Sequence, residues 1–246
     1  MLDSVDSQRV QKLFDASQVQ VDRDHAISHV LAALQRVRTQ FVFFGGTALS
    51  RTFLTAGRLS EDIDLYSADR RSLCRELDEL PGLIKEEFPR TAWNVMPSQT
   101  VDPQSSLLVC DSSTQIKVQA VDSVFRGWAN VPIVLTSIHQ RFSDVPATNL
   151  FTPTFDGFVA MKALVWFDRR LARDLFDLEA LSHKGDVTEG ARELVKQLRG
   201  FRLSKQMMAG QMVGRWYEEL AHQTRLEKTE EQCLAQVLDW WAGSDD

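Results

Sequence analysis

Several features are missing from this 246-residue sequence, and each absence excludes a class of protein. No apolar run approaches the roughly 18–20 residues that a membrane-spanning helix requires. The N-terminus, MLDSVDSQRV, lacks the basic and apolar regions of a signal peptide. The three cysteines are far apart and form no CxxC pair, which predicts neither a disulfide framework nor a thiolate zinc site. We therefore expect a cytoplasmic protein with no membrane partner.

Positive charge is also scarce, because 28 Lys and Arg residues stand against 34 Asp and Glu residues and the formal net charge is −6. Nonspecific binding to nucleic acids depends on Lys and Arg side chains that neutralise phosphates. The charge balance therefore disfavours a general nucleic-acid coat, and any polynucleotide must be held by a local basic patch. The composition is otherwise ordinary for a globular protein, with 43% hydrophobic and 25% charged residues.

Hydrophobic periodicity divides the sequence into two parts with a boundary near Asn149. Residues 1–149 alternate helical and strand-like patterns, which predicts an α/β domain with a mixed sheet. Residues 150–246 predict a helical domain, and the sequence contains no repeat or low-complexity linker, so we expect the two parts to pack closely. The helical patterns of the second part cover residues 156–182, 187–201, 204–220 and 227–243.

A glycine pair follows an apolar strand pattern in FVFFGGTALSRTFLTAGRLSEDIDLYS, residues 41–67. The run FVFF suits a strand buried on both faces. Gly45 and Gly46 end this run with a backbone that can turn tightly and approach a ligand closely. Thr47 then stands where a helix begins, and the free N–H groups of a helix N-terminus favour a bound phosphate.

Two aspartates end the same stretch on the next predicted strand. Asp62 and Asp64 are separated by one residue, so both side chains leave the same face, about 7 Å apart along the chain. Ser60 points the same way. Two such carboxylates would repel each other without a cation between them, and hard oxygen ligands suit Mg²⁺ bound together with substrate phosphates. This arrangement predicts a nucleoside triphosphate and a metal ion.

Glycine pairs and Asp-x-Asp triplets are each common, and an isolated Asp-x-Asp is more often a solvated strand end than a metal site. Their order is more specific: a buried strand, Gly-Gly, a helix and then Ser-x-Asp-x-Asp on the following strand. This order resembles motif I of the DNA polymerase β-like nucleotidyltransferases. The form GGTAL…RLSEDIDL is similar to the AbiEii/AbiGii-type toxin nucleotidyltransferases, the group that includes the MenT toxins.

A second segment, MKALVWFDRRLARDLFDLEAL at residues 161–181, resembles the later signature of that family. In the family, a helix lysine precedes an RDxxDL element. Here these elements would be Lys162 and residues 173–178. The resemblance therefore implies a polymerase β-like nucleotidyltransferase domain at residues 1–149 and a helical domain at residues 150–246 that completes its active site.

One continuous helix through this segment would place four residues on one face: Lys162, Trp166, Arg169 and Arg173. A cationic stripe with one aromatic side chain suits a triphosphate and a base. The alternative is a surface ion pair between Arg173 and Asp177, which would stabilise the helix by only about 0.3–0.5 kcal/mol and have no catalytic meaning.

The resemblance implies a role for each residue of the first motif. Asp62 and Asp64 would hold Mg²⁺, which Mn²⁺ could replace, against the triphosphate of an NTP substrate. Gly45, Gly46 and Thr47 would donate hydrogen bonds to the leaving pyrophosphate. Another three residues are candidates for contact with a phosphate or the metal shell: Ser60, Arg51 and Arg58.

In the second motif, Lys162 would neutralise charge that develops on the phosphates. Asp174 would either orient this lysine or act as a base toward the acceptor hydroxyl. Arg173 would bind the substrate. The resemblance also implies an RNA acceptor, notably the tRNA 3′ end, whose blocked aminoacylation would stop growth, and a cognate antitoxin protein.

Two other functions stay open. One is a nucleotidyltransferase that modifies a small molecule or a protein hydroxyl. The other is a noncatalytic nucleotide-binding module. A later strand, where polymerase β-like enzymes often carry a third carboxylate, has Lys117 and Gln119 on one face, and Asp122 lies off that face.

Three further groups of residues carry weaker signals. Asp24, His25 and His29 include an HxxxH pair on one helical face, but we expect surface residues there instead of a metal site. The tryptophans Trp216, Trp240 and Trp241 are expected to pack in the core. Two interpretations, an RNA-binding patch and a solvated helix face, apply equally to Arg202, Lys205 and Arg215.

Overall fold

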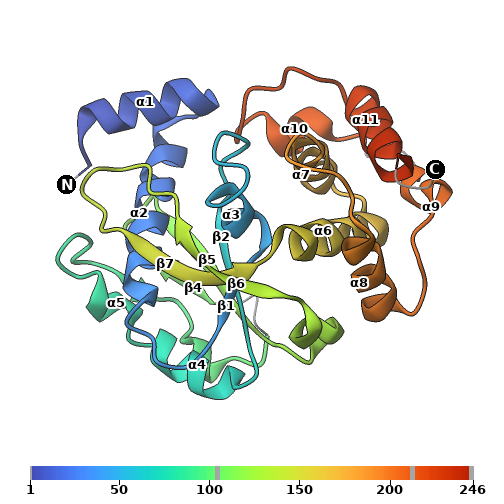
Figure 1. Ribbon diagram of the computed structural model, residues 1–246. Coiled ribbons are helices and arrows are strands. Elements are labelled where there is room, and N and C mark those ends of the chain that lie inside the picture. Colours follow the sequence, from blue (N-terminus) through green and yellow to red (C-terminus); the bar gives the residue numbers. More distant parts are fainter. Residues whose placement is uncertain (1, 103–105, 211–213, 244–246) are drawn as a thin grey trace.

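The computed structural model describes residues 2–102, 106–210 and 214–243. Its main sheet has five strands in the order β1-β2-β5-β4-β3 (Figure 1). The β2–β5 pair is parallel, and the other three pairs are antiparallel. This arrangement confirms the predicted α/β fold with a mixed sheet. The strands are β1 Val42–Phe44, β2 Asp62–Ser67, β3 Ala92–Trp93, β4 Leu107–Val109 and β5 Gln115–Asp122.

A second, two-stranded sheet was not predicted. It pairs β6, Ile133–Ile138, with β7, Thr148–Pro153, and β7 packs against β1. The outward side chains of β6 include Val134 and Leu135, so this strand lacks the polar alternation that usually marks a half-exposed strand. The predicted domain boundary at Asn149 falls within β7, and the division into two domains stays a prediction.

The helices of the first part are short except for α2, which lies along the main sheet in Figure 1. Side chains at the N-terminus fix where the two longest begin: the Asp3 carboxylate caps α1, and the Ser17 hydroxyl caps α2. Residues 70–88 contain two short helices, α4 and α5. The helices of this part are α1 Ser4–Phe14, α2 Gln18–Leu34, α3 Gly45–Ser50, α4 Arg70–Leu77 and α5 Leu80–Leu83, with 3₁₀ turns at Pro97–Gln99 and Phe125–Asn130.

The second part is mainly helical, as its patterns predicted, and its helices gather on one side of the sheet (Figure 1). Threonine caps set three of the starts: Thr154 for α6, Thr188 for α8 and Thr229, in a capping box, for α11. The helices are α6 Phe155–Arg169, α7 Ala172–Ser182, α8 Glu189–Arg199, α9 Lys205–Ala209, α10 Trp216–Leu220 and α11 Glu230–Ala242.

The prediction of one continuous helix through residues 156–182 was wrong, because the chain breaks between α6 and α7. Arg170 adopts the left-handed conformation with φ 52°, which ends α6. Its guanidinium lies over the Trp166 ring, 4.7 Å from the centroid, and donates to the carbonyls of Met207 and Met208 in α9. These tertiary contacts hold a turn that the hydrophobic periodicity does not reveal.

The hydrophobic core runs without interruption from the sheet into the helical part. One cluster of buried side chains includes Leu49 of α3, Leu65 of β2 and Phe158 of α6. The expected close packing of the two parts is therefore present, and the three tryptophans expected in the core are buried: Trp216, Trp240 and Trp241. Within the described residues, no helix combines the length and apolar character needed to cross a bilayer.

Candidate active site

A cavity of about 690 Å³ lies where the sheet meets α6 and α7. Both sequence motifs contribute to its walls, although they are about a hundred residues apart in the chain. Seven of the predicted site residues line it: Gly45, Gly46, Ser60, Asp62, Asp64, Lys162 and Arg173. The fold thus brings the glycine turn, the aspartate pair and the lysine together.

The glycine turn joins β1 to α3, and each glycine has its own steric reason. Gly45 has φ 80°, a backbone conformation that residues with a side chain rarely adopt. A Cβ at this position would also overlap the Asp64 carboxylate. A Cβ on Gly46 would lie 2.7 Å from Nη2 of Arg58 and 3.1 Å from Oγ of Ser60. The two glycines therefore let the helix start approach the polar wall of the cavity.

Asp62 and Asp64 face the cavity from alternate positions of β2, as the strand pattern predicted. In the parallel pair with β5, Asp62 lies opposite Lys117, and Asp64 lies opposite Gln119. Burial, and then the negative charge of Asp62, raise the pKa of Asp64 to about 6. The two carboxylates therefore repel each other, and a cation between them would relieve that repulsion.

Thr47 lies beneath the cavity wall, not on it. Its side chain is 1% exposed, and its hydroxyl donates to the main-chain carbonyl of Asp62. This bond ties the start of α3 to β2, so the hydroxyl is already engaged within the fold. Ser60, in contrast, does line the cavity beside the glycine turn.

Lys162 reaches the cavity from the middle of α6 and is held by two carboxylates of α7. Its Nζ lies 3.3 Å from Oδ1 of Asp174 and 2.6 Å from Oδ2 of Asp177. Arg169 also donates to both oxygens of Asp174, from Nε to Oδ2 at 2.7 Å and from Nη2 to Oδ1 at 2.9 Å. Burial alone would raise the pKa of Asp174, but Lys162 and Arg169 lower it below its ordinary value. Asp174 is fully buried and ionised, and it orients two cations.

Arg58 and Asp177 form a second buried pair beside this lysine. The guanidinium of Arg58 donates to both Asp177 oxygens at 2.9 Å, and its Nη1 donates to Oε1 of Gln223 at 2.8 Å. Burial alone would raise the pKa of Asp177, and the charges of Arg58 and Lys162 lower it. Asp177 therefore links the loop before β2 to α6 and α7, and its partners are Arg58 and Lys162, not Arg173 as in the surface-pair alternative.

Two other side chains differ from their predicted positions. Trp166, expected on the cationic stripe, is fully buried, and its indole N–H donates to the Met208 carbonyl. Trp166 does not line the cavity, whereas Lys162 and Arg169 of the same helix and Arg173 of α7 do. Arg51, a weaker phosphate candidate, is also fully buried, and it donates to Asp24 at 2.7 Å.

The basic residues of the C-terminal helices lie on ion-paired surfaces. Arg202 pairs with Glu189 and Glu193, and Lys205 pairs with Asp239 at 3.1 Å. Arg215 pairs with Glu218 at 3.0 Å. These contacts favour the interpretation of a solvated helix face over an RNA-binding patch for this group.

The sequence analysis missed Trp128, which lines the cavity, and Asp177, which holds Lys162 there without lining the cavity itself. Trp128, whose ring lies 4.6 Å from that of Phe44, lines it from the turn before β6. Asp177 was considered only as a surface partner for Arg173. Its position in the RDxxDL element was the available signal, because a carboxylate one turn after Asp174 faces the same side of the helix.

The fold is that of nucleotidyltransferases. MenT4, a nucleotidyltransferase toxin from Mycobacterium tuberculosis H37Rv, has a similar structure, with 18% sequence identity and a TM-score of 0.64 over 93% of this chain and 85% of that one. A protein from H. pylori assigned as a nucleotidyltransferase is similar at 16% identity and a TM-score of 0.54, over 90% and 92% of the two chains. A search of curated proteins found no match.

The family is shown by the sequence. The family model for the nucleotidyl transferase AbiEii toxin, Type IV TA system, matches residues 29–236. The chain belongs to this AbiEii family of toxin nucleotidyltransferases, which confirms the resemblance inferred from the two motifs. Both motifs lie within the matched residues.

Proposed function

We propose that this protein transfers NMP from an NTP to an RNA acceptor, the 3′ end of tRNA being the expected target, and thereby blocks translation and growth in the cytoplasm. The observation that supports this function best is the convergence of Gly45, Asp62, Asp64 and Lys162 on one cavity. Membership of a type IV toxin family supports the toxic effect and a cognate antitoxin.

The aspartate pair fits a divalent cation. Asp62 and Asp64 present oxygen ligands from one face of β2, and burial together with the Asp62 charge raises the pKa of Asp64, which a bound cation would offset. A Mg²⁺ or Mn²⁺ ion held there would neutralise charge on the triphosphate of the bound NTP. Lys117, opposite Asp62 on β5, occupies the face where a third acidic ligand would have to lie.

The remaining residues bind and orient the substrate in this proposal. Backbone N–H groups at the start of α3, beside Gly45 and Gly46, donate to the leaving pyrophosphate. Lys162 neutralises charge that develops on the phosphates. Asp174 positions Lys162 and Arg169, and it is a poor base because both of its oxygens already accept hydrogen bonds from these cations.

An RNA acceptor requires local cations on an acidic protein. Arg173 and Lys117 line the cavity and are the proposed phosphate contacts, while Arg170 packs on Trp166 and serves the fold. With only a few such contacts, binding should be weak, and log affinity should fall with log salt at a slope near −0.7 to −0.9 per contact.

The test is transfer of label from each of the four NTPs into purified tRNA, total RNA and protein. Asp62→Asn should abolish transfer and the growth arrest caused by expression, since the amide removes a charged ligand without removing core packing. Asp239→Asn is the matched control, because this aspartate is exposed on α11 and far along the chain from either motif. Near-normal transfer in Asp62→Asn would refute the assignment.

The same assay separates the alternative acceptors. Label that enters only protein or small molecules would identify a nucleotidyltransferase with a different acceptor. A wild-type protein that neither transfers label nor binds NTP in a Mg²⁺-dependent way would be a noncatalytic module. Each of these two results contradicts the RNA acceptor, and only the second contradicts nucleotidyl transfer.

A further inference from the structure

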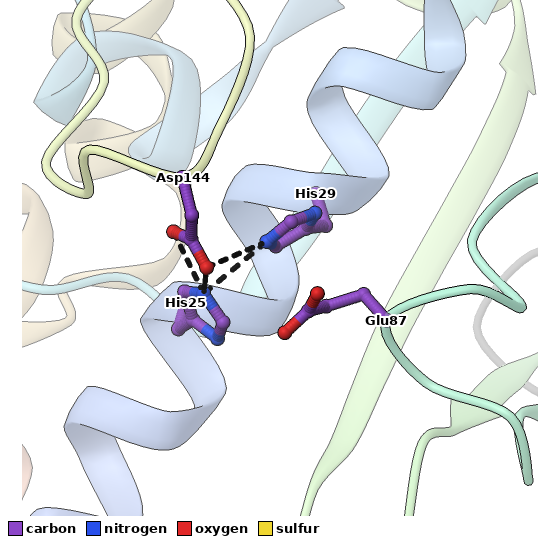
Figure 2. A group of neighbouring side chains, drawn as sticks. All are labelled: His25, His29, Glu87 and Asp144. Carbon is purple, nitrogen blue, oxygen red and sulfur yellow. Dashed lines mark hydrogen bonds and ion pairs between the residues drawn. The ribbon is translucent and has the colours of Figure 1, made fainter. Parts of the chain in front are cut away.

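Four metal-binding side chains gather away from the cavity, on the N-terminal part of the fold (Figure 2). His25 and His29 come from successive turns of α2, Asp144 from the loop between β6 and β7, and Glu87 from the segment after α5. Their ligand atoms all lie within 4.8 Å of one another, and none of the four residues lines the active-site cavity.

The expectation that these histidines are surface residues was wrong. His25 is 3% exposed. Its ring packs edge-on against Phe142, with centroids 4.9 Å apart, and Phe88 lies 5.5 Å from the His29 ring. Each loop that supplies a carboxylate therefore also places a phenylalanine against a histidine, and this apolar shell limits the access of water and fixes both rings.

Several short contacts converge on the Nε2 atoms of the two histidines. Nε2 of His25 lies 3.0 and 3.2 Å from the two Asp144 oxygens and 3.2 Å from Nε2 of His29. Nε2 of His29 in turn lies 3.7 Å from Oδ2 of Asp144. A ring nitrogen carries at most one proton and cannot donate along all of these directions, whereas a cation at their centre would be bound by every one of them.

The spacing of the atoms matches tetrahedral zinc ligands. With Zn–N and Zn–O bonds of about 2.0–2.2 Å, two ligands of a tetrahedral site lie about 3.3–3.5 Å apart. The three separations among His25, His29 and Asp144 are 3.0, 3.2 and 3.7 Å, which bracket this value. Glu87 points toward them from the other side in Figure 2 and completes four ligands.

The chemistry of the donors also selects the ion. Imidazole nitrogens suit Zn²⁺ and its transition-metal neighbours, while Mg²⁺ prefers sites made of oxygen alone. Two neutral histidines and two carboxylates carry a charge that balances a divalent ion. We propose that His25, His29, Glu87 and Asp144 form a structural zinc site that fastens α2 to the two loops, independent of the metal that serves nucleotidyl transfer.

The test starts from the full-length protein after dialysis against a chelator. Titration with Zn²⁺ against a chromophoric chelator should give one tight equivalent per chain, and zinc should raise the melting temperature. Asp144→Asn and His29→Ala should each weaken the affinity by more than about 100-fold, because even the loss of groups outside the ligand shell weakens metal sites 10–100-fold. Cobalt in place of zinc should show the visible absorption of a tetrahedral ion in the wild type only.

Two control variants make the result specific. His183→Ala removes a histidine that pairs with Glu179 on α7, and Asp64→Asn removes an active-site carboxylate; both should bind zinc as the wild type does. Asp144 is the most exposed member of the cluster, so Asp144→Asn should fold, and circular dichroism checks this. Wild type without tight zinc, or zinc retained by Asp144→Asn and His29→Ala, would overturn the proposal.

Discussion

Replacing Asp64 with asparagine should stabilise the metal-free protein at neutral pH. Burial and the Asp62 charge raise the pKa of Asp64 from 3.8 to about 6. Ionising this group in the folded protein is therefore disfavoured by about 3 kcal/mol, which is an upper value because water in the cavity screens the charge. Asp64→Asn removes the charge and hence this unfavourable contribution.

The pH dependence has a definite sign. Between pH 3.8 and about 6 the folded protein binds more protons at Asp64 than the unfolded chain does, so this group lowers the stability as the pH rises through that window. The destabilisation caused by ionised Asp64 is complete above about pH 6 and absent below pH 3.8. The free energy of unfolding of Asp64→Asn minus that of the wild type should therefore be near zero at pH 4 and should reach up to about 3 kcal/mol at pH 7.5.

Urea unfolding in a chelator, at both pH values, measures this difference. Addition of Mg²⁺ at pH 7.5 should reverse the order of the two proteins, because an ion bound only by the folded wild type stabilises it by mass action. The reasoning would be refuted if the difference in unfolding free energy did not change with pH, or if the variant were less stable than the wild type at pH 7.5 without metal. Either result would mean that ionised Asp64 does not destabilise the metal-free protein.

Three other variants test the remaining walls of the cavity. Lys162→Ala should lower turnover by roughly 10²-fold or more, measured per folded protein in single-turnover assays, because it removes a preorganised positive charge; a smaller loss would mean a structural lysine. Gly45→Ala should abolish transfer by displacing Asp64, whereas Gly200→Ala, with φ 81° and open space around it, should lose only about 1–2 kcal/mol of stability and keep its activity. Arg173→Glu should weaken tRNA modification far more than NTP binding, and it should make tRNA modification less dependent on salt. Arg202→Glu should have neither effect. Equal effects of the two variants would show that the RNA does not bind at Arg173.

The parts of the fold that follow from local pattern were predictable. Phe41–Phe44, the glycine pair and the aspartates at positions 62 and 64 are close in the chain, and alternation along a strand fixes which side chains share a face. The side chains of Asp62 and Asp64 do share a face in the structure, because both line the cavity. The hairpin of β6 and β7 was missed because β6 lacks the polar alternation of a half-exposed strand: Val134 and Leu135 are both exposed.

The break after α6 shows why long helical patterns mislead. Every residue from Phe155 to Ser182 is compatible with a helix, and only the contacts of Arg170 with Trp166 and with the carbonyls in α9 select a left-handed residue. The break matters for the site, because it turns α7 so that Asp174 and Asp177 both reach Lys162. In a straight helix, Asp174 would lie about three turns and Asp177 about four turns from Lys162 along one axis.

The charged network also shows how an acidic protein can keep cations beside the cavity proposed to bind the triphosphate. Lys162 and Arg58 share Asp177, and Lys162 and Arg169 share Asp174, so two buried carboxylates hold three cations in place. Burying these groups is favourable only as a set, since removal of one partner leaves an uncompensated charge. The three cations of this set line the same cavity as the aspartate pair. A triphosphate that enters between them would meet cations that are already fixed, and their orientation would not have to be established when the substrate binds.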